Sequence, residues 1–226
     1  MASTLITEPM KATDLEEALI VGEAAFEDLN RLVYTKTPLS DESRQRDILR
    51  RTKVFGNNTH DFKVTDTSTG RIIAVSRWSP YEEEQVLDKT VEEVVAERLS
   101  VDIPEMRKDV AARVWTVINE GKRAILGIVD DDGKVVRMRK RFELDALYVH
   151  PDYQRRGVAR GLLEWGIAEA ERLGLPVYLE ATVAGRPVYE RSGFEALQVA
   201  ELDGREFGVD QSTEVTVCTR CRSWLG

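Results

Sequence analysis

Hydrophobic residues recur along this chain with two periods, which divide it into predicted strands and helices. An apolar run with strand character covers 144–149 and is stopped by Pro151. After a short polar turn, Gly157 opens a stretch with apolar residues at helical spacing. Gly174 then stands where a helix C-cap favours glycine. These signals predict a strand, a turn and an amphipathic helix over 144–174.

The rest of the chain follows the same two periods. Thr13 to Glu16 has the form of a capping box and is expected to start a helix that runs to Phe26. Ser40 is expected to cap another helix of about ten residues, with Ile48 and Leu49 on its buried side. In chain order, strands are expected at 4–8, 62–64, 71–78, 177–181 and 214–221.

Between Trp78 and the central strand lie about sixty residues with a different pattern. One amphipathic helix is expected over 86–99, and a second from Met106 to Ile118 after a capping signal at 102–105. We expect one domain over 1–226, with 80–133 as a helical insertion, although the length also allows two small domains.

Charge and composition narrow the class of partner. The net charge is −8, which disfavours a nucleic-acid surface and makes a cationic small molecule or peptide the more natural partner. No apolar run reaches the length of a membrane span, and the N-terminus lacks the apolar region of a signal peptide. We therefore expect a soluble protein of the cytoplasm, with the nucleus also open. The acidic run 82–84 and the pair Glu92 and Glu93 are interpreted as a solvated helix face or a cation-recognition patch. The basic cluster 137–141 is interpreted as a charged strand edge or a contact for a phosphate.

A metal site is not expected. Cys218 and Cys221 lie three residues apart on a predicted strand and would point to opposite faces, which argues against a disulfide, a redox pair or a zinc half-site. The two histidines, His60 and His150, are far apart in the sequence. The cysteines are therefore interpreted as packing residues.

The junction between the central strand and its helix has the chemistry of a diphosphate cradle. A strand that leads directly into a helix directs unpaired backbone N–H groups, and the positive end of the helix dipole, at one point above the sheet. Gly157 and Ala159 allow close backbone approach, while Arg155, Arg156 and Arg160 add positive charge. The spacing fits neither a Walker A loop nor a dinucleotide fingerprint.

Two motifs resemble those of the GNAT N-acetyltransferases. The segment Gln154-Arg-Arg-Gly-Val-Ala159 is similar to the Q/R-x-x-G-x-G/A signature with which that family grips the pyrophosphate of acetyl-coenzyme A. A strand later, Val188-Tyr-Glu-Arg-Ser-Gly-Phe194 is similar to the family's hydrophobic-Tyr-Glu-x-x-Gly-Phe segment. The resemblance is specific over 144–194 and loose elsewhere. Where many members carry an asparagine near the second motif, this chain has Thr182.

The resemblance implies a fold and a set of site residues. The expected fold is α/β, with a central mixed, mostly antiparallel sheet of about seven strands flanked by helices, whose central strands splay apart to admit the pantetheine arm. By resemblance, Tyr189 is the acid that protonates the coenzyme thiolate, and Glu143 is the candidate general base, with Asp145 one side-chain repeat away. Leu147 is expected at a strand bulge, where its N–H is free for the thioester carbonyl. The expected coenzyme-binding residues are Leu147, Val149, Arg155, Arg156, Gly157, Ala159 and Arg160.

The predicted activity follows from these roles. We expect N-acetylation of a primary amine on a small molecule or peptide, with acetyl-coenzyme A as co-substrate, no metal, and direct attack in a ternary complex of a monomer or homodimer. The insertion at 80–133 is interpreted either as the acceptor side of the site or as a helical pair that only covers the sheet. The alternative function is a non-catalytic acyl-coenzyme A binder that kept the cradle and lost transfer.

Overall fold

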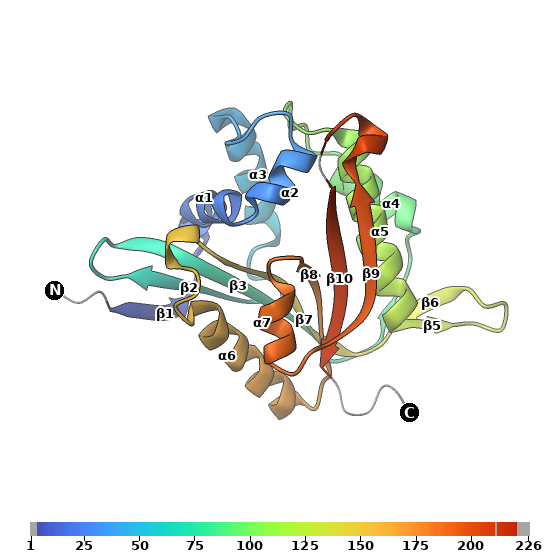
Figure 1. The fold of residues 1–226 in the computed structure, drawn as a ribbon. Coiled ribbons are helices and arrows are strands. Elements are labelled where there is room, and N and C mark those ends of the chain that lie inside the picture. Colours follow the sequence, from blue (N-terminus) through green and yellow to red (C-terminus); the bar gives the residue numbers. More distant parts are fainter. Residues whose placement is uncertain (1–3, 211, 221–226) are drawn as a thin grey trace.

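The centre of the fold is a seven-stranded sheet. The computed structural model describes residues 4–210 and 212–220. The strand order is β1-β2-β3-β7-β8-β10-β9 (Figure 1), and neighbouring strands are antiparallel except for the parallel pair β7 and β8. Helices lie on both faces of this sheet, so the predicted α/β fold class is confirmed.

The element bounds agree with the strong sequence signals. The strands are β1 (Leu5–Pro9), β2 (His60–Asp66), β3 (Arg71–Tyr81), β4 (Gln85–Val86), β5 (Gly127–Val129), β6 (Val135–Met138), β7 (Arg141–Val149), β8 (Val177–Thr182), β9 (Glu195–Asp203) and β10 (Ser212–Arg220). The α-helices are α1 (Leu15–Ala25), α2 (Glu27–Val33), α3 (Asp41–Val54), α4 (Val91–Arg98), α5 (Lys108–Leu126), α6 (Val158–Leu173) and α7 (Arg186–Arg191). Short 3-10 turns η1 (Ala12–Asp14), η2 (Pro151–Tyr153) and η3 (Gly204–Phe207) complete the described chain.

The two central strands pair over only part of their length. Residues 142–144 of β7 are in register with 177–179 of β8. Beyond Leu144, β7 continues for five residues and β8 for three without pairing to each other. We call this gap between unpaired strand ends the splay; it confirms the expected separation of the central strands.

One face of the sheet carries α6 and α7, and we call it face A. Here α6 packs against a core that includes Trp78, Phe142, Leu144 and Leu179. The contact is close: a Cβ added at Gly166 would lie 2.1 Å from a ring atom of Trp78. The helix therefore needs a glycine at this position to reach the sheet.

The opposite face, face B, carries α1, α3 and α5. The α1 helix packs on Ile72 and Val75 of β3, with Tyr148 of β7 against the same cluster. The α5 helix lies over β9 and β10, where Val110, Val114 and Val117 contact Leu202 and Val215. The splay is therefore flanked on face B by helices from two distant segments of the chain (Figure 1).

The segment 80–133 differs in detail from its prediction. Val86 lies in β4 and not in a helix, and α4 begins only at Val91, after a capping box formed by Thr90 and Glu93. The second helix, α5, runs well past Ile118 to Leu126. A small sheet has the order β4-β6-β5, and its β5–β6 hairpin projects from the body (Figure 1).

This small sheet also explains the two charged runs. Glu83 pairs with Lys140 at 3.1 Å, and Glu84 pairs with Arg137 at 2.9 Å. Two charges of the acidic run are therefore paired with two of the basic cluster beside β4 and β6. The expected solvated helix face is wrong for 82–84, because these residues are not helical, but it holds for Glu92 and Glu93, which are exposed in the first turn of α4.

Three smaller predictions need comment. Ser40 does cap a helix, since its Oγ accepts from the Ser43 N–H at 3.3 Å, but Leu49 is 65% exposed and not on a buried side. The first capping interaction involves Asp14, whose carboxylate accepts from the Lys11 N–H, so the cap lies two residues before the expected Thr13. Cys218 is a free, fully buried thiol on β10, while Cys221 lies outside the described residues.

Candidate active site

A bulge in β7 marks the mouth of the splay. Arg77 is in register with Ala146, whereas the next residue, Trp78, is in register with Leu144. Asp145 is therefore the extra residue of a β-bulge. The expected bulge at Leu147 is wrong by two residues, because Leu147 pairs regularly with Ser76.

The backbone of β7 nevertheless directs Leu147 toward the splay. The His150 N–H donates to the Ile73 carbonyl at 2.8 Å, so this residue faces β3. Because the hydrogen-bonding direction alternates along a strand, Leu147 and Val149 face the opposite side, where β8 has diverged. The Gln154 side-chain amide donates to the Val149 carbonyl at 3.1 Å, which agrees with this direction. The Leu147 N–H therefore lies in the splay without a strand partner.

The loop between β7 and α6 has the backbone of an anion cradle. Arg155 has φ 60° and Gly157 has φ 82°, both in the left-handed region. A Cβ added at Gly157 would meet no atom within 4 Å, so packing does not require this glycine. Its left-handed conformation is what favours glycine. The open space beside it suits a ligand that approaches the first turn of α6.

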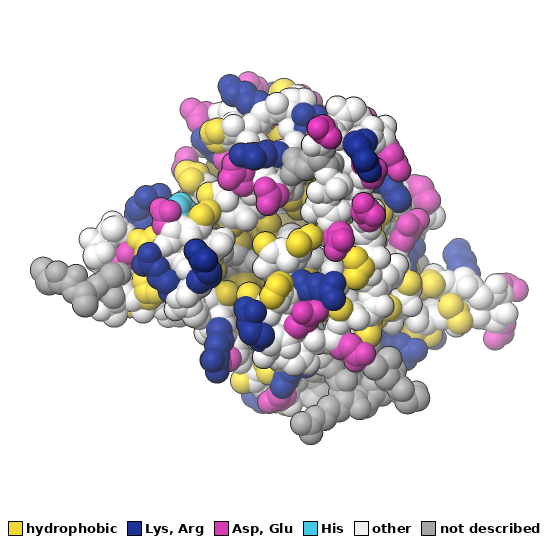
Figure 2. Space-filling view, in the orientation of Figure 1, with side chains coloured by type: hydrophobic (Ala, Val, Ile, Leu, Met, Phe, Trp, Pro, Cys, Tyr) yellow, Lys and Arg dark blue, Asp and Glu magenta, His cyan; other side chains and the backbone are white. Residues whose placement is uncertain are grey.

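Arginines add charge to this cradle. Neither Arg155 nor Arg156 is ion-paired with any residue in the part of the chain that the structure describes, and the Arg156 guanidinium lies 5.0 Å from the Tyr153 ring centroid. Arg160 is paired with Glu164 at 2.7 Å. Figure 2 shows Lys and Arg side chains gathered over the start of α6, with hydrophobic side chains at the surface beside them. The cradle thus combines free N–H groups with uncommitted positive charge.

Glu143, the expected general base, is held in a buried ion network. Its side chain is 3% exposed and accepts from Arg141 Nε at 2.7 Å and from Lys122 Nζ. Burial alone would raise the pKa of Glu143, but Lys122 and Arg141 outweigh it and the pKa is lowered. A buried carboxylate with two cations attached is a weak proton acceptor, so its environment favours a structural role.

Asp145 has the opposite character. It is exposed to solvent, makes no ion pair within residues 4–210 and 212–220, and accepts a hydrogen bond from the Ser79 hydroxyl. Protein atoms nevertheless crowd its carboxyl, and this burial, followed by the charge of Glu143, raises the pKa of Asp145 to about 6. A carboxylate with a pKa near neutrality and access to solvent has the properties of a general base.

Tyr189 lies on face A of the same region. It belongs to α7, is 6% exposed, and packs in the core cluster that contains Leu144 and Ala181, with Leu147 against it. Pro187 stands in the first turn of α7, and Gly193 adopts φ 83° just after its end, as the sequence predicted. Burial, followed by the charge of Cys218, raises the pKa of Tyr189, so the phenol stays protonated at neutral pH.

These residues lie on the two sides of the splay. Asp145 is at its mouth beside Ser79, which is in register with the face-B residue Glu143. Tyr189 is on face A, in the layer of α6 and α7. A carboxyl group and a phenol thus flank a gap lined by the Leu147 N–H.

The position of the bulge could have been read from the sequence. Phe142, Leu144, Leu147 and Val149 all contact the face-A cores, so the period of two is broken between Leu144 and Leu147. A spacing of three in a strand is the pattern that one bulged residue produces. The prediction of one uniform apolar strand over 144–149 did not include this break.

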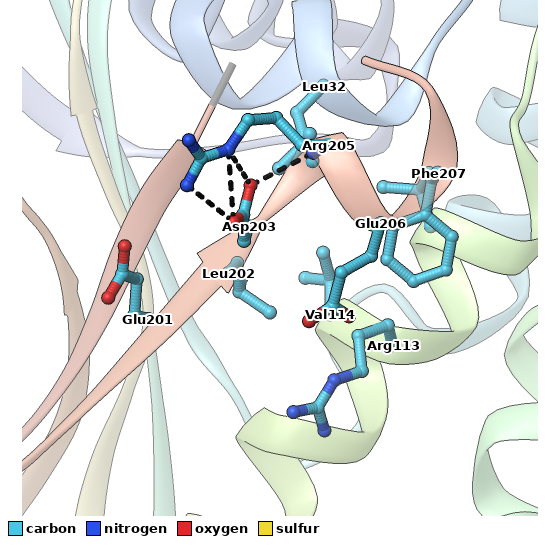
Figure 3. Close-up of a pocket in the computed structure, with 11 residues that line it drawn as sticks. Leu32, Arg113, Val114, Glu201, Leu202, Asp203, Arg205, Glu206 and Phe207 are labelled. Atoms are coloured by element: carbon cyan, nitrogen blue, oxygen red, sulfur yellow. Dashed lines mark hydrogen bonds and ion pairs between the residues drawn. The ribbon is translucent and has the colours of Figure 1, made fainter. Parts of the chain in front are cut away.

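A separate cavity lies between α5, α2, the end of β9 and η3 (Figure 3). It has a volume of about 330 Å³ and is lined by apolar residues such as Leu32, Val114 and Phe207. Arg113 and Glu206 contribute charged groups, and Asp203 pairs with Arg205 at its rim. None of the predicted site residues lines this cavity.

The described residues contain neither a group suited to a metal ion nor a helix suited to a membrane. Among the described residues, no group of three or more His, Cys, Asp or Glu side chains is arranged to hold a metal ion. No helix in the described ranges is both long and apolar enough to cross a membrane.

The fold and the site define a class, the acetyltransferases, and comparison with known proteins gives the family. The acetyltransferase (GNAT) domain family matches residues 79–206, more than half of the chain. This chain therefore belongs to the GNAT acetyltransferase family. The match includes the insertion at 80–133 as well as the cradle and Tyr189.

Individual relatives are more distant. The chain is 46% identical over 44 residues to a protein of Ajellomyces capsulatus named "Probable acyltransferase SID5", a match that spans 20% of this chain and 32% of that protein. A mosquito arylalkylamine N-acetyltransferase-like 5b structure has a TM-score of 0.61 at 13% identity, covering 96% of this chain and 99% of that chain. A Drosophila melanogaster polyamine N-acetyltransferase has a TM-score of 0.57 at 17% identity, covering 96% and 99% respectively. At these identities the two structures support the fold.

Proposed function

We propose that this protein is an acetyl-coenzyme A-dependent N-acetyltransferase that transfers the acetyl group to a primary amine by direct attack in a ternary complex. The observation that carries the proposal is the placement of Asp145 and Tyr189 on opposite sides of the splay, with a free backbone N–H between them. A direct transfer needs one group to accept the proton of the amine and another to protonate the departing thiolate.

The residues present fit the coenzyme. The left-handed Gly157, the open space beside it and the uncommitted Arg155 and Arg156 suit a diphosphate, while the splay gives an extended arm a path into the sheet. Acetyl-coenzyme A supplies an activated acyl group as its thioester. Ala159 adds another N–H in the first turn of α6, and Arg160 adds charge that is shared with Glu164.

Each step then has a residue assigned to it. Asp145 accepts a proton from the amine as its nitrogen bonds to the thioester carbon. The Leu147 N–H donates to the carbonyl oxygen, where negative charge develops. Tyr189 donates its hydroxyl proton to the sulfur as the carbon–sulfur bond breaks. The assignment replaces Glu143 by Asp145 as the base, because Glu143 is buried and paired with two cations.

The test is an assay of thiol release from acetyl-coenzyme A against a panel of amines, with Asp145→Asn as the central variant. We expect Asp145→Asn to lower kcat by about 10²- to 10⁴-fold, the range of general-base contributions. The exposed turn variant Asp131→Asn is the matched control and should keep the wild-type rate. The wild-type log kcat/KM should rise with pH and level off above the pKa of Asp145, about 6.

Two outcomes would count against the proposal. A wild-type rate in Asp145→Asn, with chemistry rate-limiting, would remove Asp145 as the base. Coenzyme binding by calorimetry without thiol release from any amine would favour the non-catalytic acyl-coenzyme A binder.

A further inference from the structure

The charges on face B of the splay are nearly all paired with one another. Glu143 is bonded to Arg141 and Lys122, and Lys122 also lies 3.4 Å from Glu180. These four groups carry two positive and two negative charges, so they neutralise each other. Asp145 then remains as a carboxylate with no cation attached to it among the described residues.

One cation nearby is also left without a partner. Arg98, at the end of α4, makes no ion pair with any residue for which the structure gives a position. Its guanidinium carbon lies 4.1 Å from the ring centroid of Trp115 on α5. Because Trp115 lies on α5, the helix that reaches Glu143 through Lys122, Arg98 is on face B as well, and its pKa responds to the charges of Glu180, Asp145 and Glu143.

The α5 helix sets the spacing between Arg98 and the ion network at Lys122. Trp115 and Lys122 are seven residues apart, so they lie on one face of α5 about 10 Å apart along its axis. Lys122 contacts the carboxylates of the splay, and Trp115 supports Arg98 two turns away. The guanidinium therefore lies about two helical turns along α5 from the ion network at Lys122.

A stacked guanidinium of this kind is suited to bind an anion. Stacking on an indole occupies the face of the planar group and leaves its N–H edges free for a carboxylate. Arg98 is exposed to solvent, but the protein atoms around its guanidinium, followed by repulsion from Arg50, lower its pKa, so a bound anion would offset an unfavourable environment. Arg50 is itself paired with Asp47 at 2.6 Å and is not free for a ligand.

We propose that the acceptor is a zwitterionic amine whose carboxylate is bound by Arg98 while its amino group faces Asp145. This proposal rests on the proposed N-acetyltransferase function and names the substrate class of that site. The unpaired Asp145 and Arg98 have opposite signs, and they complement an amine that bears one carboxylate, as an amino acid does. A phosphate would carry up to two charges, for which the site offers only one uncommitted guanidinium.

The experiment compares acceptors that differ only in the anionic group. An amino acid, its carboxamide, the decarboxylated amine and the corresponding amino-phosphate are assayed for thiol release with the wild-type protein. We expect kcat/KM for the amino acid to exceed that for the carboxamide and the decarboxylated amine by about 10- to 100-fold, the range of one charged hydrogen-bonded contact. A preference for the decarboxylated amine would overturn the proposal, and a preference for the phosphate would replace the carboxylate.

Variants of Arg98 and Arg113 test whether the preference for a carboxylate depends on Arg98. Arg98→Gln should lower kcat/KM for the amino acid by about 10- to 100-fold, mainly through KM, and leave the decarboxylated amine and the KM for acetyl-coenzyme A unchanged. Arg98→Lys should restore part of the loss. Arg113→Gln, a matched change on the other side of α5, should have no effect on either acceptor. Equal losses for both acceptors in Arg98→Gln would show a merely structural role.

Failure of the proposed function can be told apart from failure of this inference. If no amine releases thiol, calorimetric titration of the amino acid into wild-type and Arg98→Gln protein, each with bound coenzyme A, still measures the contact. Binding that weakens in Arg98→Gln would support the carboxylate contact without catalysis. Undetectable binding to the wild type, or equal binding to both proteins, would overturn it.

Discussion

Replacing Glu143 by glutamine separates a structural role from a catalytic one. In the folded protein this carboxylate neutralises Arg141, which is 1% exposed, and Lys122, which is 18% exposed. Breaking a buried ion pair by removing one partner typically costs about 3–5 kcal/mol, because a charge is left uncompensated. Two features reduce this cost: Lys122 keeps Glu180 at 3.4 Å, and the glutamine oxygen can still accept from Arg141. We therefore expect a loss of about 3 kcal/mol.

Such a loss is measurable as a shift in melting temperature. For a chain of this size, 1 kcal/mol corresponds to about 2–4 °C, so Glu143→Gln should melt about 6–12 °C below the wild type at pH 7. The control is Glu83→Gln, whose side chain is 87% exposed and pairs with Lys140. An exposed pair contributes about 1 kcal/mol or less, so this control should melt close to the wild type.

The pH dependence gives a second measurement on the same pair of proteins. The pKa of Glu143 is lowered in the folded state, so its contribution is complete above the unfolded value of about 4.3. The contribution is then lost as the pH falls through the folded pKa. The difference in stability between wild type and Glu143→Gln should therefore be constant near neutrality and shrink in acid. Calorimetric melts from pH 3 to pH 8 test this sign.

The reasoning would be refuted by a specific combination of results. If Glu143→Gln melts with the wild type and loses activity by the factor expected for Asp145→Asn, then Glu143 is the base and its ion pairs are incidental. A variant that is less stable but retains its turnover at a temperature where it is folded would support the structural role.

Three further changes test the packing of α6, the acid and the cradle. Gly166→Ala would force a Cβ to within 2.1 Å of the tryptophan ring beneath α6 and should cost about 1–3 kcal/mol or more, whereas Gly161→Ala in the same helix meets no atom within 4 Å and should be neutral or stabilising in thermal melts. Tyr189→Phe keeps the ring and should lower kcat by about 10²-fold with the melting temperature almost unchanged, and a wild-type rate under rate-limiting chemistry would exclude the phenol as the acid. Gly157→Glu should weaken acetyl-coenzyme A binding in calorimetric titration far more than Gly174→Glu, which places the same charge at a left-handed glycine at the other end of the helix. Equal affinities in these two folded variants would contradict the cradle.

The parts of the fold that the sequence predicted are those set by neighbouring residues. The turn from β7 into α6 depends on Gly157, the end of α6 on Gly174, and the short α7 on Pro187 and Gly193. Each of these signals acts through the conformation of one residue and its immediate neighbours. The sequence pattern could therefore locate the cradle and Tyr189 without knowledge of the rest of the fold.

The prediction for the insertion at 80–133 was less accurate, because the structure of this segment depends on residues far away in the sequence. The segment around Val86 has helical spacing, but it pairs with Arg137 and Met138, about fifty residues later, and becomes a strand. The charges of Glu83 and Glu84 are satisfied by that same pairing. A helical period in the sequence cannot reveal a strand partner of this kind, and tertiary contacts override it.

Glu143 and Asp145 show how one bulged residue can place two nearby carboxylates of one strand in different environments. In a regular strand both side chains would point to the same face and share one environment. The bulge at Asp145 ends the regular register just after Leu144, so Glu143 stays over the paired part of β7, under Lys122 and Arg141. Asp145 instead stands where β8 has diverged and solvent reaches the carboxyl. The same bulge leaves Leu147 on face A with its N–H in the splay. A single extra residue therefore both exposes a carboxylate of raised pKa and aligns a backbone donor with the gap that the coenzyme would enter.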